Sequence, residues 1–137
     1  MAGGTPGAML RTLVHIQQTF REMNEAIAPQ QIEILFEIAS QPGLTQQELA
    51  NRTGMALSSI SRNLMALGEW NRSGKPGLSL VETADDPVER RRQIAFLTPK
   101  GRSLVRRILE QLGTKDLDTW KAPTAREFLN NAYSTSR

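Results

Sequence analysis

The chain has 137 residues, a length that suits one compact domain, and its 39% apolar and 23% charged residues are ordinary for a globular protein. It has no cysteine and one histidine, which excludes disulfides, thiolate metal sites, cysteine nucleophiles and a multi-histidine metal site within one chain. The net charge is only +3, but residues 45–107 hold 11 basic and 6 acidic groups. Such a segment indicates a surface for a polyanion, although an arginine-rich solvated surface would have the same composition.

The first third of the chain predicts two helices. Apolar residues recur at spacings of three and four from Met9 to Ile27, which predicts a helix with one apolar side that Leu10 and Val14 widen. Either the chain's own domain or a second copy of the chain could cover that side. Pro29 suits the first position of a second helix. The sequence Gln-Pro-Gly at residues 41–43 is expected to end that helix.

The next segment predicts two short helices joined at a glycine. Thr45 and Glu48 match a capping box that would start the first helix, and Gly54 is free to take the left-handed conformation that ends it. The second helix is expected over residues 57–67, with an arginine on its outer side among small polar residues. No acid lies within residues 49–68, so nothing on that side would repel phosphate.

The second half of the chain predicts a β-hairpin and two more helices. Strands are expected at residues 78–83 and 93–97, joined by a turn rich in charge. A threonine and a proline at residues 98–99 would cap and start the next helix. A second capping box at residues 124–127 opens a short last helix that is expected to end at about residue 132.

A helix-turn-helix followed by a hairpin is the order of a winged helix, and two stretches carry a closer resemblance. The first is ILFEIASQPGLTQQELANRTGMALSSISRNLMAL, and the second is DDPVERRRQIAFLTPKG. Together they resemble the MarR family of bacterial regulators, in which an acidic–basic turn precedes a strand that ends in Leu-Thr and is followed by Gly. The matching positions are Glu89-Arg90-Arg91, Leu97-Thr98 and Gly101, and the resemblance covers roughly residues 29–112.

The resemblance implies a mainly α fold with a small β-hairpin wing, a winged helix-turn-helix that dimerises through its N- and C-terminal helices. It divides the chain into an N-terminal dimerisation helix at residues 1–28, a DNA-binding domain at residues 29–101 and C-terminal dimerisation helices at residues 102–137. The chain departs from the family pattern at Ala56, where a serine often caps the recognition helix, and at Glu82, where an arginine often closes the first wing strand.

The function that the resemblance implies is sequence-specific binding of double-stranded DNA by a homodimer, as a transcriptional regulator and specifically a repressor. The helix at residues 57–67 would lie in the major groove, and the hairpin at residues 78–97 would lie near the minor groove. Such a regulator is not an enzyme and needs no cofactor, and the sequence leaves a small-molecule effector open. Because the sequence has no membrane span or signal-peptide pattern, the expected location is the bacterial cytoplasm, at the nucleoid, with the gene in the bacterium or in a phage.

The chemistry of the side chains indicates which residues could make these contacts. Arg62 can bind a guanine edge or clamp a phosphate, and short hydroxyl and amide side chains and a helix N-terminus can bind bases or phosphates nearby. Wing-tip arginines suit a narrow minor groove, although Arg91 could instead pair with a nearby acid and shape the wing. The expected DNA-binding residues are Thr45, Gln46, Ser58, Ser59, Ser61, Arg62, Asn63, Arg72, Lys75, Arg90, Arg91 and Arg92. The expected dimer-interface residues are Met9, Leu13, Ile16, Phe20, Met23, Trp120, Phe128 and Leu129.

A second class of function is compatible with the same sequence. A winged helix can serve as a protein-interaction module in a replication or phage-type assembly, and Trp70, in the long loop at residues 68–77, and Trp120 favour it. An enzyme is disfavoured, because the chain has no Ser/His/Asp arrangement, phosphate-binding glycine loop or convergent pair of acids.

Overall fold

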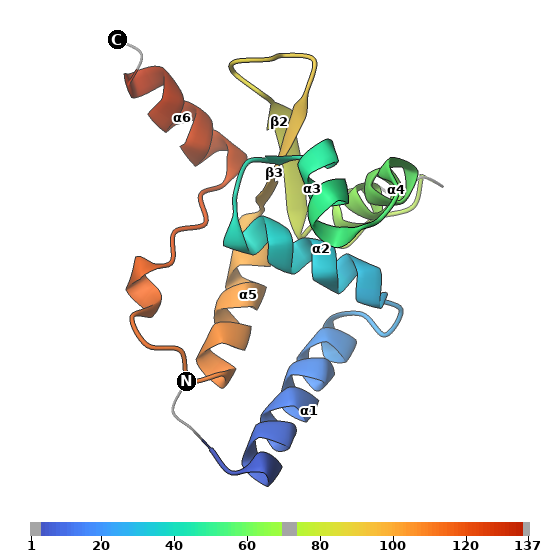
Figure 1. Ribbon diagram of the computed structural model, residues 1–137, viewed down its shortest axis with the longest axis vertical. Helices are drawn as coiled ribbons and strands as arrows, with labels where there is room; N and C mark the ends of the chain where they lie inside the picture. The colour runs from blue at the N-terminus through green and yellow to red at the C-terminus, as the bar shows by residue number, and fades with distance from the viewer. Residues whose placement is uncertain (1–3, 70–73, 136–137) are drawn as a thin grey trace.

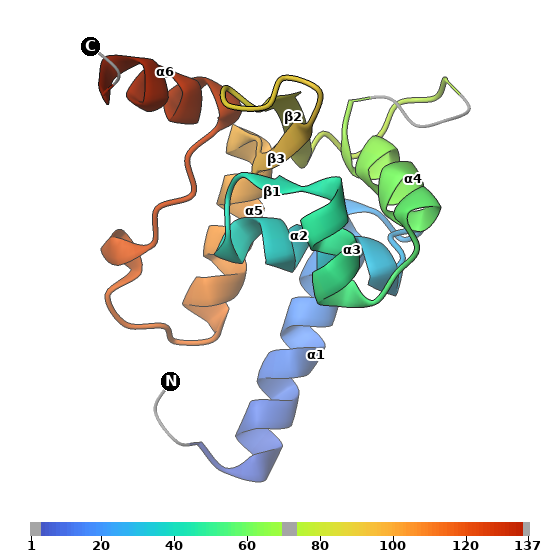
Figure 2. The same cartoon turned by 45° about the horizontal axis from the view of Figure 1, so that its top comes forward.

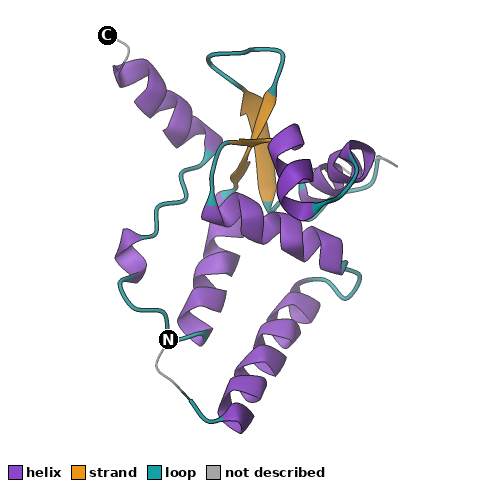
Figure 3. Ribbon diagram, in the orientation of Figure 1, coloured by secondary structure: helices purple, strands orange, loops and turns teal. Residues whose placement is uncertain are grey.

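The computed structural model describes residues 4–69 and 74–135, and within them the fold is mainly helical with one small sheet (Figures 1 and 3). The helices are α1 (Pro6–Met23), α2 (Pro29–Ser40), α3 (Gln46–Thr53), α4 (Leu57–Leu67), α5 (Pro99–Gln111) and α6 (Ala125–Thr135). The strands are β1 (Leu44–Thr45), β2 (Val81–Asp85) and β3 (Gln93–Leu97), and a short 3-10 helix, η1 (Leu117–Thr119), precedes α6. This confirms the predicted mainly α fold with a helix-turn-helix and a β-hairpin wing.

The three strands form one antiparallel sheet with β3 in the middle, in the order β1-β3-β2. Strand β2 pairs with β3 over its whole length, from Val81 opposite Leu97 to Asp85 opposite Gln93. Strand β1 was not predicted, because a two-residue strand leaves no alternating pattern to detect. It ties the start of α3 to the wing, since Leu44 lies opposite Ala95.

The core lies where α2, α3, α4 and the sheet meet. Ile34, Leu49 and Ile60 are wholly buried there. Helix α1 joins this core through its second half, where Ile16 and Phe20 are also buried. Both were expected at a dimer interface. That role stays a prediction, although the chain's own core already covers these two side chains.

The C-terminal helix lies beside the wing, on the side away from α3 and α4 (Figures 1 and 2). The Phe128 ring packs on the Phe96 ring of β3 with centroids 4.9 Å apart. Trp120, just after η1, donates its indole N–H to the Ala39 carbonyl oxygen at 3.0 Å. These two residues were also expected at a dimer interface. Both are only partly buried within the chain, so that role stays a prediction.

Three predicted elements have shifted boundaries. Helix α1 ends at Met23, short of Ile27, because Asn24 leaves the helical conformation and its side chain accepts the Ala26 amide at 2.7 Å. Strand β2 starts three residues late, because residues 78–80 hydrogen-bond to carbonyl oxygens at the end of α4 instead of to β3. Helix α6 extends to Thr135, beyond the expected end at residue 132.

Within the described ranges, no helix has the length and apolar character needed to cross a membrane. In the same part of the chain, no three His, Asp or Glu side chains gather where they could hold a metal ion.

Candidate nucleic-acid interface

The helix-turn-helix is held by the local signals that predicted it. The Thr45 hydroxyl accepts the Glu48 amide at 3.1 Å, and a Glu48 carboxylate oxygen accepts the Thr45 amide at 2.9 Å. Gly54 ends α3 with φ at +74°, the left-handed conformation that costs glycine least. Ile60 is wholly buried between the helices. Together these contacts fix α4 with its outer side toward solvent.

The outer side of α4 is small, polar and basic, as predicted. Ser58 and Arg62 are exposed at its centre, and in the described part of the chain Arg62 has neither a hydrogen bond nor an ion pair. Asn63 lies at the edge that faces α2, where its amide nitrogen donates to the Ser59 carbonyl oxygen at 2.9 Å and to Gln30 at 3.4 Å. These bonds direct Asn63 away from the centre, so Ser58 and Arg62 are the most accessible groups for a ligand.

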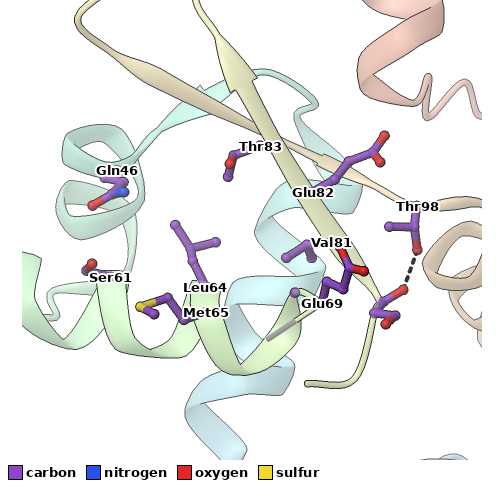
Figure 4. A pocket seen from close by; sticks show the side chains of 11 residues that line it. Gln46, Ser61, Leu64, Met65, Glu69, Val81, Glu82, Thr83 and Thr98 are labelled. Carbon is purple, nitrogen blue, oxygen red and sulfur yellow. Dashed lines mark hydrogen bonds between the residues drawn. The ribbon is translucent and has the colours of Figure 1, made fainter. Parts of the chain in front are cut away.

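A crevice of about 530 Å³ separates α4 from the first wing strand (Figure 4). Gln46 of α3, Ser61 of α4 and Thr83 of β2 line its mouth, and Leu64 and Val81 form its floor. None of the three polar side chains at the mouth has a hydrogen-bond partner among the described residues. Three unpaired polar groups from three elements can therefore bind one ligand that lies between the helix and the wing. Thr83 was not among the predicted site residues.

The wing tip is built around Asp86. Its carboxylate accepts the Arg92 guanidinium at 2.8 Å and the Val88 amide at 2.9 Å, and its own amide donates to the Arg92 carbonyl oxygen at 2.9 Å. The Val88 amide and the Arg92 guanidinium lower the pKa of the Asp86 carboxyl from its ordinary value. The acid–arginine pair considered for Arg91 thus forms with Arg92. Arg90 and Arg91 stay exposed, with no ion pair in the described part of the chain.

The start of α3 offers fewer amide donors than predicted. The Thr45 amide was expected to reach phosphate, but it already donates to Glu48, and Thr45 is buried. Gln46 keeps a side chain free to bind, and it borders both the crevice beside α4 and a hollow of about 750 Å³ between α3 and the wing tip. The phosphate contact therefore stays a prediction for Gln46 and is corrected for the Thr45 amide.

The capping box gives a testable pH dependence. The Thr45 amide and hydroxyl lower the pKa of Glu48 from its ordinary value. A carboxyl whose pKa is lower in the folded state stabilises the fold above its ordinary pKa, and this stabilisation is lost as the pH falls through the lowered value. Glu48→Gln keeps a capping-box side chain but removes the charge, so it is expected to lower the free energy of unfolding by about 0.5 kcal/mol at pH 7.

Urea unfolding of both proteins at several pH values measures this difference. It should shrink toward zero as the pH falls below the ordinary glutamate pKa. Glu25→Gln is the matched control, since Glu25 is exposed and has no partner among the described residues. A Glu48→Gln difference that stays constant from neutral to acid pH would rule out the charge as its origin.

The long loop before the wing is only partly described. Arg72 and Trp70 lie outside the described residues, so the predicted phosphate contact of Arg72 and the role of Trp70 in a protein-interaction module stay predictions. Lys75 is exposed, and its contact with phosphate stays a prediction too. Trp120, the other residue that favoured a protein-interaction module, packs against the chain's own core instead.

Comparisons with known proteins agree with this geometry. A family model described as winged helix-turn-helix DNA-binding matches residues 28–69. The crystal structure of MarR is similar, with 26% identity over 96% of this chain and 91% of that chain, and a TM-score of 0.55. A mutant MarR from E. coli complexed with operator DNA has 25% identity, covers 93% and 91% of the two chains, and has a TM-score of 0.52. The chain is similar in sequence and fold to the MarR regulators over nearly its whole length.

One further structure is similar in fold. The transcriptional repressor CouR, bound to a 23-mer DNA duplex, has 24% identity, covers 93% of this chain and 83% of that chain, and has a TM-score of 0.56. Comparison with the curated proteins gives no match. The chain is therefore a MarR-like protein with a winged helix-turn-helix of the DNA-binding type.

Two departures from the family pattern now have structural accounts. Ala56 starts α4 without a side-chain cap, so an amide at the start of α4 lacks the hydroxyl partner that a serine would give it. Glu82 accepts the Ala125 amide at 2.9 Å, so it holds the first turn of α6 against β2. The sequence offered no signal for this last contact, because its two partners lie 43 residues apart.

Proposed function

We propose that this chain is a transcriptional repressor of the MarR family that binds a specific site in double-stranded DNA as a homodimer. Helix α4 would lie in the major groove, with Ser58 and Arg62 toward the base edges. The wing would lie near the minor groove. The repressor role rests on similarity in fold to CouR, which is called a transcriptional repressor.

The observation that carries the proposal is the outer side of α4. It combines an unpaired arginine with small side chains and no acid, so it can approach a polyanion closely. A guanidinium in this position can form two hydrogen bonds with a guanine edge. An ordinary solvated helix would instead carry acids and bases in pairs one turn apart.

The wing supports a second contact on the same side of the fold. Asp86 holds Arg92 and the backbone of the turn, so the tip has one preferred shape. Arg90 and Arg91 are then the free cations for a narrow minor groove, whose potential attracts arginine. In this proposal Arg92 shapes the wing and contacts DNA less. Gln46, Ser61 and Thr83 would meet the phosphate backbone that passes between α4 and the wing.

The first half of α1 supports the homodimer. Leu10, Leu13 and Val14 remain exposed on it, whereas Ile16 and Phe20 in the second half of the same helix are buried. Contiguous exposed apolar side chains on a small domain mark an interaction surface. Of the interface residues expected from the sequence, the ones that the chain's own core does not bury stay in the proposal: Met9, Leu13, Met23, Trp120, Phe128 and Leu129.

The decisive experiment compares the DNA binding of the native chain with that of Arg62→Ala. A random duplex library first gives the preferred site, and fluorescence anisotropy then gives the Kd at several salt concentrations. Arg62→Ala is expected to raise the Kd by about tenfold or more and to relax the preference at one base pair per half-site. The Kd should also rise steeply with salt, because phosphate contacts release counterions.

Arg11→Ala is the matched control, because Arg11 is an exposed arginine on α1, away from α4 and the wing. It should leave both the Kd and the base preference unchanged. The proposal fails if Arg62→Ala and the native chain have equal affinity and equal base preference.

A further inference from the structure

Among the described residues, large exposed apolar side chains occur on the helices and at the wing tip. Leu10, Leu13 and Val14 lie on α1, Phe36 of α2 packs edge-on against Phe20 of α1, and Val88 lies at the wing tip. The remaining group is on α4, where Leu57 is 46% and Met65 is 42% exposed. A recognition helix of eleven residues thus presents two large apolar side chains to solvent, beside the polar groups that are proposed to read DNA.

The core does not need these two side chains. Ile60, Leu64 and Leu67 are the buried residues of α4. Leu57 and Met65 belong neither to the core cluster nor to the partly buried residues packed against it. Ser61 follows Leu57 by about one helical turn, and Met65 follows Ser61 by another. The three side chains therefore share one edge of the helix, next to Ser58 and Arg62.

Met65 is placed where a base edge could meet it. In Figure 4 its side chain lies at the mouth of the crevice between α4 and β2, near Ser61 and Gln46. Ser61 and Gln46 are uncharged, whereas Glu69, one turn after Met65, also lines the crevice. Methionine has three flexible side-chain torsions and a polarisable sulfur, so it adapts its shape to a small apolar group.

We infer that Leu57 and Met65 contact thymine methyl groups in the major groove, so that each half-site carries thymine beside the base pair met by Arg62. The inference rests on the proposed binding of α4 in that groove. The thymine methyl is the apolar group that base edges offer there, whereas cytosine presents an amino donor instead. Leucine or methionine on the reading face therefore favours thymine over cytosine at the same position.

The surroundings of the pair favour DNA over a protein partner. Arg62 adjoins both side chains without an ion pair in the described part of the chain, and no acid lies within residues 49–68. A protein partner would need an acid of its own to match Arg62, whereas a duplex supplies both phosphate and methyl groups. The test below distinguishes contact of this edge with DNA from its use as a binding site for a protein.

The test removes the methyl groups from DNA without changing its base pairing. The full chain first selects its preferred duplex from a random library, and each thymine of that duplex is then replaced by uracil, which lacks only the methyl group. Anisotropy at fixed salt gives the Kd of each duplex. At one or two positions per half-site, replacement is expected to raise the Kd of the native chain about fourfold, the effect of losing one buried methyl.

The protein variants are Met65→Gln and Leu57→Gln, which keep side chains of similar length and good helix propensity. Each should abolish the uracil effect at its own position and leave the effect at the other. Val88→Gln is the control, because Val88 is an exposed apolar residue of the wing and should leave every uracil effect unchanged.

Two failures can be told apart. If binding depends on Arg62 but no thymine replacement changes the Kd of the native chain, the inference is overturned and the proposed function stands. The inference is also overturned if the uracil effects are equal in the native chain and in both glutamine variants. If the native chain selects no preferred duplex at all, the inference and the proposed function both fall.

Discussion

Gly101→Ala is expected to destabilise the fold by roughly 3 kcal/mol, the upper range for forcing an atom into a packed site. Gly101 lies in the first turn of α5, where a Cβ atom would come 2.0 Å from the Leu80 carbonyl oxygen and 2.9 Å from the Leu80 carbonyl carbon. These are backbone atoms, so the clash cannot be relieved by turning a side chain. The same carbonyl oxygen accepts the Thr98 amide at 3.0 Å, so moving it also weakens the joint between the wing and α5.

Thermal or urea unfolding followed by circular dichroism measures this effect. Gly7→Ala is the matched control, because Gly7 lies in the first turn of α1 and an added Cβ would meet nothing within 4 Å. It should leave stability unchanged or raise it slightly, since alanine favours the helix more than glycine does. If the two variants are equally stable, a close approach of α5 to residue 80 does not limit the residue at position 101.

Signals within a few residues of each other predicted most of the local structure. Thr45 and Glu48 are three residues apart, and their reciprocal bonds form as expected. Thr98 caps α5 with Pro99 in its first turn for the same reason. A cap depends only on the residues of one helical turn, so the sequence contains all of its partners.

Contacts between distant segments were harder to predict. An apolar stripe shows that a helix face avoids water, but not what covers it. Ile16 and Phe20 follow the same spacing as Leu13, yet the chain buries the first two and leaves Leu13 exposed. Phe128 was predicted as an interface residue, although its partner is Phe96 of the wing. Deciding such cases requires the three-dimensional path of the chain, which the periodicity does not contain.

The candidate site also has parts that local sequence signals predict and parts that they do not. The outer side of α4 could be predicted, because helical geometry alone places Ser58 and Arg62 opposite the buried residues. The crevice could not, because its polar rim combines Gln46, Ser61 and Thr83 from three elements. The sequence indicated that a wing arginine could pair with a nearby acid, but it named Arg91. Three arginines are consecutive there, and the geometry of the turn places Arg92 against Asp86.

Leu13→Glu is expected to convert the protein into a monomer and to weaken operator binding by roughly 100-fold or more. Leu13 is 54% exposed, at the centre of the apolar group on the first half of α1. A carboxylate there would have to be buried without a partner when two copies meet, which strongly disfavours the interface. A monomer then engages one half-site at a time and loses the gain from linking two recognition helices. Sedimentation velocity gives the oligomeric state, and anisotropy on the selected duplex gives the Kd.

His15→Glu is the matched control for charge, because His15 is exposed on the polar side of the same helix. It should keep both the dimer and the native Kd. The two readouts of Leu13→Glu also separate its causes. A monomer that keeps the native affinity would mean that one copy is enough for DNA binding. A dimer with native affinity would mean that the exposed half of α1 is not the interface, and the surface that joins two copies would have to be sought elsewhere.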